Sequence, residues 1–167
     1  MIRSALFFFV SLAIATAAHA SDSLYDSKTA VHLAPEMIQH FGPLSSGIRY
    51  DKRMIHAAEI AQARARSHST ARCWHYVKDA LVAAHVVSDR PSTAYAKQAG
   101  DELMTRYGFK KLHIKDPSKA PVGAVLVYGG RGAGHVEIRT RTGYVSDFFS
   151  PRPFTLRPLI GVYVKPS

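Results

Sequence analysis

Cysteine is nearly absent from the 167-residue sequence, which holds only Cys73. A single cysteine excludes an intrachain disulfide, so no such bond can stabilise the fold. Acidic residues are also scarce, since 12 Asp and Glu stand against 22 Lys and Arg and give a formal net charge of +10. This excess favours an anionic partner, although a solvated basic surface explains it equally well because no basic run is longer than Lys110-Lys111.

Motifs for binding metals and phosphates are missing as well. The nine histidines show no His-Glu-x-x-His pattern and no other metal-ligand spacing, and His75 points elsewhere on the predicted helix than Cys73. The glycine-rich segment 129–134 precedes a predicted strand and lacks the Lys-Ser/Thr pair of a phosphate-binding loop. We therefore expect neither a metal nor an organic cofactor, and we interpret segment 129–134 as a mobile loop.

Only one long apolar run is present, and it lies at the N-terminus. Residues 1–20 combine the basic Arg3, an apolar stretch over 5–14 and an Ala-x-Ala ending at Ala20, as in a secretory signal peptide. The apolar stretch is shorter than the roughly 20 residues that a membrane-spanning helix needs. We therefore expect cleavage near Ala20 and a periplasmic or secreted product without a stable membrane span. Removal of Arg3 lowers the net charge from +10 to +9, and export argues against nucleic acid as a partner.

The mature chain divides into an irregular segment at 21–50, with room for a short helix at 35–41, and one domain at 51–167. Apolar spacing and capping residues predict three helices, at 51–66, from Ser69 or Thr70 to about residue 84, and from Ser92 to Tyr107. Apolar–polar alternation at 109–114, the apolar run at 122–128 and the segments between turn residues predict five strands, at 109–114, 122–128, 135–140, 144–149 and 160–164. Helices followed by a meandering antiparallel sheet indicate an α+β fold.

Cys73 would lie in the first turn of the second predicted helix. The unpaired backbone N–H groups and the positive dipole end found there stabilise a thiolate and can hold an oxyanion. The alternative is a small buried hydrophobe on the core face of the helix. His135 favours catalysis, because it begins a strand directly after the glycine-rich loop and could serve as the base for the thiol.

Two carboxylates compete to orient His135. Asp147 follows twelve residues later, and across a tight antiparallel hairpin an even separation places both side chains on the same face. Asp147 could therefore accept a hydrogen bond from one ring nitrogen while the other faces Cys73, as in a catalytic triad. Glu137 lies on the same face and is the rival; its plainer interpretation is a solvated carboxylate paired with a nearby arginine.

Four further residues are candidates for substrate or oxyanion binding, each with a structural alternative. Trp74 either lines a substrate groove or packs against the first helix of the domain. Tyr50 and Ser69 could each donate a hydrogen bond to an oxyanion. Arg72 could favour the thiolate or bind a substrate carboxylate, or it could simply be a solvated arginine.

Three motifs together resemble the NlpC-type and CHAP-type papain-like cell-wall hydrolases. These are Cys-x-x-Tyr-Val at 73–77, Pro-x-Gly followed by an apolar run at 121–128, and Gly-His-Val-x-Ile at 134–138. Their order covers about residues 67–164, most of the mature domain. Two positions depart from the family pattern: Ala124 replaces its usual Asp, and Asp147 stands where NlpC-type enzymes usually have His, Asn or Gln.

The resemblance implies a papain-like core and a cysteine peptidase or amidase that acts on peptidoglycan stem peptides. Cys73 would be the nucleophile, His135 the base and Asp147 the orienting residue. An anionic cell-envelope polymer suits the basic chain, which we expect to be a monomer. Two alternatives stay open: a non-catalytic protein that binds wall or membrane by charge, and a thiol acyltransferase on the same scaffold.

Overall fold

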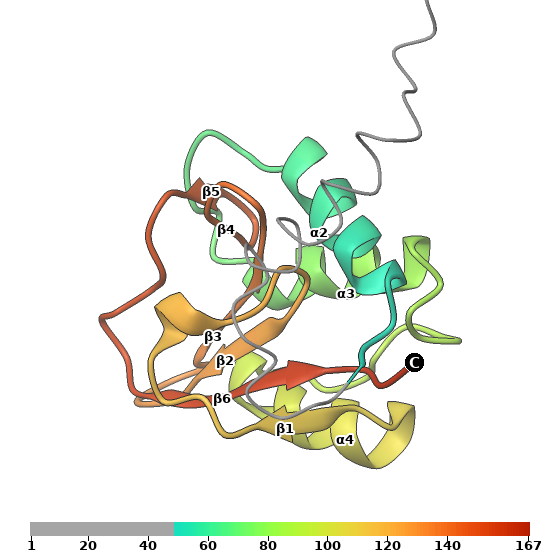
Figure 1. Cartoon of the computed structure of the whole chain (residues 1–167). Helices are drawn as coiled ribbons and strands as arrows, with labels where there is room; N and C mark the ends of the chain where they lie inside the picture. Colours follow the sequence, from blue (N-terminus) through green and yellow to red (C-terminus); the bar gives the residue numbers. More distant parts are fainter. Residues whose placement is uncertain (1–48) are drawn as a thin grey trace, which may run out of the picture.

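The computed structural model describes residues 49–167. The expected signal peptide at 1–20, the short helix at 35–41 and all but the last two residues of the segment 21–50 lie outside the described residues. Within them, three α-helices precede the six strands of an antiparallel sheet, so the mixed α+β architecture expected from the sequence is present. Figure 1 shows helices α2 and α3 together on one side of the sheet, with α4 beside strand β1.

The helices are shorter than their sequence patterns suggested. They are α2 (Arg53–Ala63), α3 (Cys73–Ala83) and α4 (Ala99–Tyr107), with 3-10 turns η1 (Ala96–Gln98) and η2 (Pro117–Lys119). Ser92 does not cap α4; its N–H and hydroxyl instead donate to Glu102 Oε1 at 2.6 and 2.9 Å. Gly108 ends α4 with a φ of 72°, the left-handed conformation that glycine adopts without strain.

The sheet follows the order β1-β6-β2-β3-β4-β5 and every pair is antiparallel. Its strands are β1 (Lys110–Leu112), β2 (Val125–Tyr128), β3 (His135–Arg139), β4 (Tyr144–Val145), β5 (Phe149–Ser150) and β6 (Leu159–Val164). The strand predicted at 144–149 is therefore two short strands. A turn separates them, in which the Ser146 N–H donates to the Phe148 carbonyl at 2.9 Å. Residue 147 thus lies in a turn rather than on a strand.

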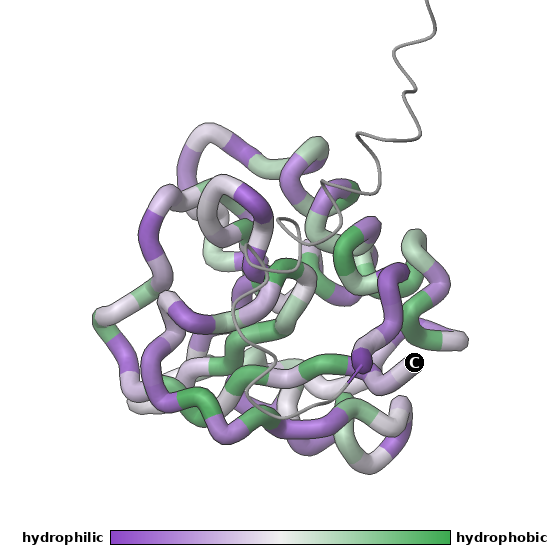
Figure 2. The backbone as a smooth tube through the Cα atoms, viewed as in Figure 1, coloured by the Kyte–Doolittle hydropathy of each residue, from purple (hydrophilic) through white to green (hydrophobic). Residues whose placement is uncertain are grey.

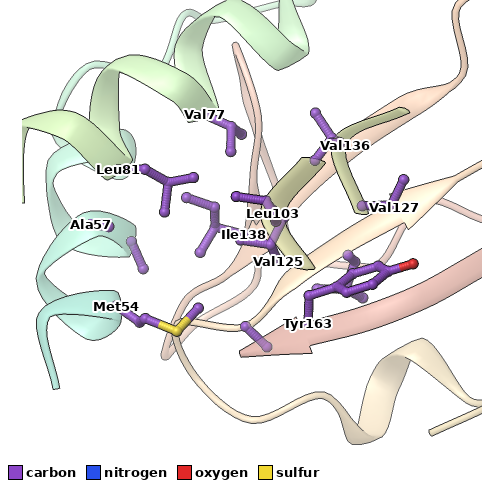
Figure 3. Close-up of a cluster of buried hydrophobic side chains, with 14 of the residues drawn as sticks. Met54, Ala57, Val77, Leu81, Leu103, Val125, Val127, Val136, Ile138 and Tyr163 are labelled. Carbon is purple, nitrogen blue, oxygen red and sulfur yellow. The ribbon is translucent and has the colours of Figure 1, made fainter. Parts of the chain in front are cut away.

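A continuous hydrophobic core lies between the helices and the central strands. Figure 3 shows Met54, Val77 and Leu81 of the helices pointing toward Val125 and Ile138 of the sheet, and all five are fully buried. Figure 2 shows the same pattern along the chain, with hydrophobic segments in the central strands and hydrophilic ones in the outer loops. The alternation of these side chains along β2 and β3 fixes which residues face the helices and which face away.

Strand register places Tyr128, His135 and Glu137 on the face of the sheet that points away from the helices. Val125 pairs with Ile138 and Val127 with Val136, and these residues point toward the helices. Tyr128 pairs with His135, so these two side chains share the other face of the sheet. Glu137 lies two residues along the same strand and therefore belongs to that face too.

Candidate active site

Cys73 is the first residue of α3 and its side chain is half-buried. No side chain caps this helix at its N-cap residue Arg72, so the first-turn N–H groups stay available to a bound group. Ala71 just before it has a φ of 59°, an unusual value for a residue other than glycine. The chain therefore makes a sharp, strained turn directly before the cysteine.

His135 is the first residue of β3 and is only 8% exposed. Gly134 allows the chain to enter the strand here, because it has a φ of 80° and a Cβ at this position would lie 2.5 Å from the Tyr128 carbonyl oxygen. The preceding loop is held by the Lys97 N–H, which donates to the Ala133 carbonyl at 2.9 Å. The glycine-rich segment thus brings the backbone close to η1 and delivers His135 to the sheet edge.

Cys73 and Glu137 both act on the imidazole of His135. Burial lowers the pKa of His135, but the nearby thiol of Cys73 and carboxylate of Glu137 favour the charged ring, outweigh burial and raise the pKa to about 9. Nε2 of His135 is buried without a hydrogen-bond partner and lies 3.7 Å from Oε2 of Glu137, within range of an ion pair. The structure therefore brings Cys73, His135 and Glu137 into one cluster.

Glu137 is itself held firmly. Its side chain is buried, and its Oε1 accepts hydrogen bonds from the Tyr128 hydroxyl at 2.7 Å and the Phe154 N–H at 3.1 Å. These donors keep Oε2 turned toward His135. The interpretation of Glu137 as a solvated strand carboxylate is therefore wrong, because the loop over the sheet face encloses it.

Phe154 is a site residue that sequence reasoning missed. Its ring lies over the imidazole of His135, with ring centroids 4.3 Å apart and an interplanar angle of 31°. The same residue supplies the N–H that binds Glu137. In the sequence, Phe154 is a single aromatic residue between Pro153 and Pro158. This position hinted at a role for its ring, but only the folded loop shows that the ring covers His135.

The predicted role of Asp147 is corrected by its contacts. Its fully buried carboxylate accepts from the Thr70 N–H at 2.5 Å, the Thr70 hydroxyl at 2.9 Å and the Arg72 N–H at 3.2 Å, whereas His135 is not among its hydrogen-bond partners in the described chain. The reason is the turn between β4 and β5, which directs residue 147 toward the loop before α3. The carboxylate beside the imidazole is Glu137.

The fold is similar to that of the type VI effector Tae3 from Ralstonia pickettii. In the native effector–immunity complex Tae3–Tai3, the matched chain is 28% identical, with a TM-score of 0.54 and coverage of 67% of this chain and 98% of that chain. In the selenomethionine form of the complex the values are 30% identity, a TM-score of 0.47 and coverage of 57% and 80%. No protein-family model and no curated protein matches the sequence. An NlpC- or CHAP-type core stays a prediction.

Three of the remaining candidates have structural contacts that differ from the predicted roles. Trp74 is 4% exposed and its indole N–H donates to the Thr93 carbonyl at 3.1 Å, so it packs inside the protein and lines no groove. The Tyr50 hydroxyl donates a hydrogen bond to the Val122 carbonyl at 3.0 Å, so it is already engaged and is not free to bind an oxyanion. The Ser69 hydroxyl lies 3.4 Å from Asp147 Oδ2 and belongs to the same cluster as Thr70.

Arg72 remains at the surface beside the nucleophile. Its side chain is exposed, and Nη2 lies 3.5 Å from Nε2 of His75. Residues 49–167 contain no group of three or more side chains suited to hold a metal ion. Nor does this part of the chain contain a helix long and apolar enough to cross a bilayer.

Proposed function

We propose that the protein is an exported cysteine amidase or peptidase that hydrolyses amide bonds in the stem peptides of peptidoglycan. The proposal is carried by Cys73 at the uncapped N-terminus of α3 together with the buried imidazole of His135, which lies 3.7 Å from the Glu137 carboxylate and whose pKa is raised by Cys73 and Glu137. The similarity to Tae3 supports hydrolysis of cell-wall amide bonds. The excess of basic residues is suited to an anionic polymer.

The first chemical step joins the substrate to Cys73. The neutral imidazole of His135 takes the thiol proton and becomes an imidazolium that stabilises the thiolate, and Cys73 Sγ then attacks the amide carbonyl carbon. Since Nε2 of His135 faces Glu137, we assign Nδ1 to the thiol. The backbone N–H of Cys73 and of the residues after it in the first turn would hold the oxyanion of the tetrahedral intermediate.

The second step breaks the scissile bond. His135 donates its proton to the leaving amine nitrogen, the C–N bond breaks, and a thioester to Cys73 remains. Water then attacks the thioester carbonyl, with His135 as the base, and releases the new carboxylic acid and the thiolate. Throughout, Glu137 stabilises the imidazolium and keeps its ring oriented, which is the role first assigned to Asp147.

The direct test is digestion of purified peptidoglycan by the wild type and by Cys73→Ala, with released fragments identified by mass spectrometry. We expect new fragments from the wild type alone, and their masses identify the bond that is cut. Adding an amine acceptor distinguishes a hydrolase from an acyltransferase, because only the latter would give acylated amine as the main product.

Alkylation by iodoacetamide provides a second readout that needs no substrate. An activated Cys73 should react much faster near neutral pH than the same cysteine in the unfolded chain. Identical fragments from wild type and Cys73→Ala, or alkylation no faster in the folded protein, would refute the proposed nucleophile and favour a wall-binding protein.

A further inference from the structure

Asp147 is a buried carboxylate whose hydrogen bonds come from residues 69–72 and from Ser146 in its own turn. Oδ2 lies within hydrogen-bond distance of the Thr70 N–H, the Thr70 hydroxyl, the Ser69 hydroxyl and the Arg72 N–H. Burial alone would raise the pKa of Asp147, but the hydrogen bonds from Thr70 and Arg72 lower it below its usual range. A carboxylate that is fully buried needs such a set of donors to remain charged.

The main chain of the same residue binds the other end of that segment. The Asp147 carbonyl accepts from the Arg66 N–H at 2.8 Å, and Arg66 forms a parallel bridge with Phe148. The connection between α2 and α3 is thus attached to the 146–148 turn at Arg66 and again at residues 69–72. Among the described hydrogen bonds, no other part of the protein binds this connection at as many points.

The segment needs this support because it contains a strained residue. Ala71 has a left-handed φ of 59°, a conformation that is unfavourable for a residue with a Cβ. The N–H groups on either side of it, those of Thr70 and Arg72, both donate to Oδ2 of Asp147. One oxygen atom therefore clamps the chain before and after the strained position, two residues ahead of the nucleophile.

We propose that Asp147 is a positioning residue for the nucleophile: by clamping residues 69–72 it fixes where α3 begins, and so where Cys73 and the first-turn N–H groups lie relative to His135. The inference rests on the proposed function for its catalytic meaning. It differs from a triad role because Asp147 acts through the backbone of the nucleophile's own loop and does not contact the imidazole.

The division of labour between the two oxygens makes the proposal testable. Oδ2 accepts the hydrogen bonds from the loop, including those of the Thr70 and Arg72 N–H groups. The side-chain hydrogen bond to Oδ1 comes from the Ser146 hydroxyl, at 3.2 Å. An asparagine can place its carbonyl oxygen in the Oδ2 position and its amide toward the Ser146 hydroxyl, which can also accept. The clamp thus needs an acceptor of this shape more than it needs a charge.

The experiment compares Asp147→Ala with Asp147→Asn. We expect Asp147→Ala to lower kcat about 100-fold with little change in KM, because the nucleophile is misplaced rather than the substrate lost. The alkylation rate of Cys73 in the folded protein should fall in parallel. Asp147→Asn should recover most of both losses, to within a few-fold of the wild type.

Asp116→Ala is the matched control, because Asp116 also caps a loop N–H, that of Ser118, outside the site. It should change stability without changing the alkylation rate of the folded protein. If Asp147→Ala does not fold, Thr70→Val removes one hydroxyl donor to Oδ2, keeps the N–H, and should give a smaller loss of the same kind.

Two results would overturn the inference. The first is an Asp147→Ala protein that is folded and alkylated at the wild-type rate. The second is an Asp147→Asn protein as impaired as Asp147→Ala, which would mean that the charge and not the clamp matters. If the wild type neither digests peptidoglycan nor shows fast alkylation, the proposed function is wrong. In that case faster protease cleavage of the 66–72 segment in Asp147→Ala than in the wild type still shows whether Asp147 holds this segment.

Discussion

At the scale of single residues, the site depends on how one carboxylate divides its two oxygens. Oε1 of Glu137 is occupied by the Tyr128 hydroxyl and the Phe154 N–H, and Oε2 faces Nε2 of His135. Phe154 covers the ring from the loop above. The imidazole is thereby held between an aromatic ring and a carboxylate, and its second nitrogen is left for the thiol.

Glu137→Gln should damage catalysis although it is nearly isosteric. A glutamine must turn its NH₂ either toward the Tyr128 and Phe154 donors or toward the imidazolium, and both placements set donor against donor. We expect kcat to fall by about tenfold or more with a small change in KM. Steady-state kinetics on soluble muropeptides measure it, and Tyr128→Phe, which removes only one donor to Oε1, should cost clearly less.

The raised pKa of His135 sets an alkaline limit. Activity should decline as pH rises through about 9, because the imidazolium that protonates the leaving amine loses its proton there. The same shift stabilises the fold fully below the usual histidine pKa of about 6.5 and ceases to do so as pH rises through about 9. The pH–rate profile and an NMR titration of the ring test both statements, and Glu137→Gln should move the limit to lower pH.

At the scale of elements, the entry into β3 is as important as the strand itself. Gly134 combines a left-handed φ of 80° with close contacts, since an added Cβ would lie 2.5 Å from the Tyr128 carbonyl and 2.8 Å from the Lys97 N atom. Gly132 in the same loop has a φ of 75°, but nothing lies within 4 Å of an added Cβ. An alanine at Gly132 would therefore suffer only the left-handed conformation, whereas an alanine at Gly134 would suffer both that conformation and steric contacts.

Gly134→Ala should lower the free energy of unfolding by about 2 to 3 kcal/mol and displace His135. Gly132→Ala has only the left-handed penalty of about 1 kcal/mol and should leave activity nearly unchanged. Urea unfolding and kcat are measured for both variants. Equal stability losses in the two would mean that the backbone approach at Gly134 is unimportant.

At the scale of the whole molecule, buried carboxylates tie the loops to the helices and the sheet. Asp147 holds the loop before α3, and Glu102 of α4 accepts from the N–H and hydroxyl groups of both Ser92 and Thr93. Thr93 in turn accepts from the indole of Trp74 and the ammonium of Lys78 through its carbonyl. With one cysteine in the chain, such contacts and the core do the work that disulfides do elsewhere.

Acid should therefore unfold the protein through these groups. Burial opposes ionisation of Glu102, but hydrogen bonds from Thr93 and Ser92 lower its pKa, as those from Thr70 and Arg72 lower that of Asp147. A lowered pKa means that the stabilisation is present above the unfolded-state value, about 4, and is lost as pH falls through the folded-state value. Thermal melts across this range should show it, and Glu102→Gln should flatten the slope.

The sequence predicted the elements that carry the nucleophile and the base. Cys73 at a helix start and His135 at a strand start follow from local patterns, namely apolar spacing and a glycine-rich loop, which the fold preserves. The order of helices and strands was likewise readable from periodicity. Such features depend on neighbours in the chain and need no knowledge of distant contacts.

The failures all depend on contacts between segments distant in sequence. Asp147 was placed on a strand because 144–149 is predicted as one strand after the turn at Gly143, whereas a turn at 146–148 redirects its side chain to Thr70. For Trp74 the sequence left both a groove role and a packing role open, and the contact that distinguishes them is with Thr93, nineteen residues away in the chain. Phe154 reaches Glu137 through a proline-rich loop whose path has no periodic signal.

The 146–148 turn has one more consequence, for the rate at which backbone protons exchange with solvent. Thr70 and Arg72 are exposed residues of a connecting loop, yet their amide protons are donated to a fully buried oxygen. They can exchange only when the turn at the edge of the sheet opens, so they should be as slow as amides of β3 and not as fast as ordinary loop amides. The loop before Cys73 and the edge of the sheet would then open and close as one cooperative unit.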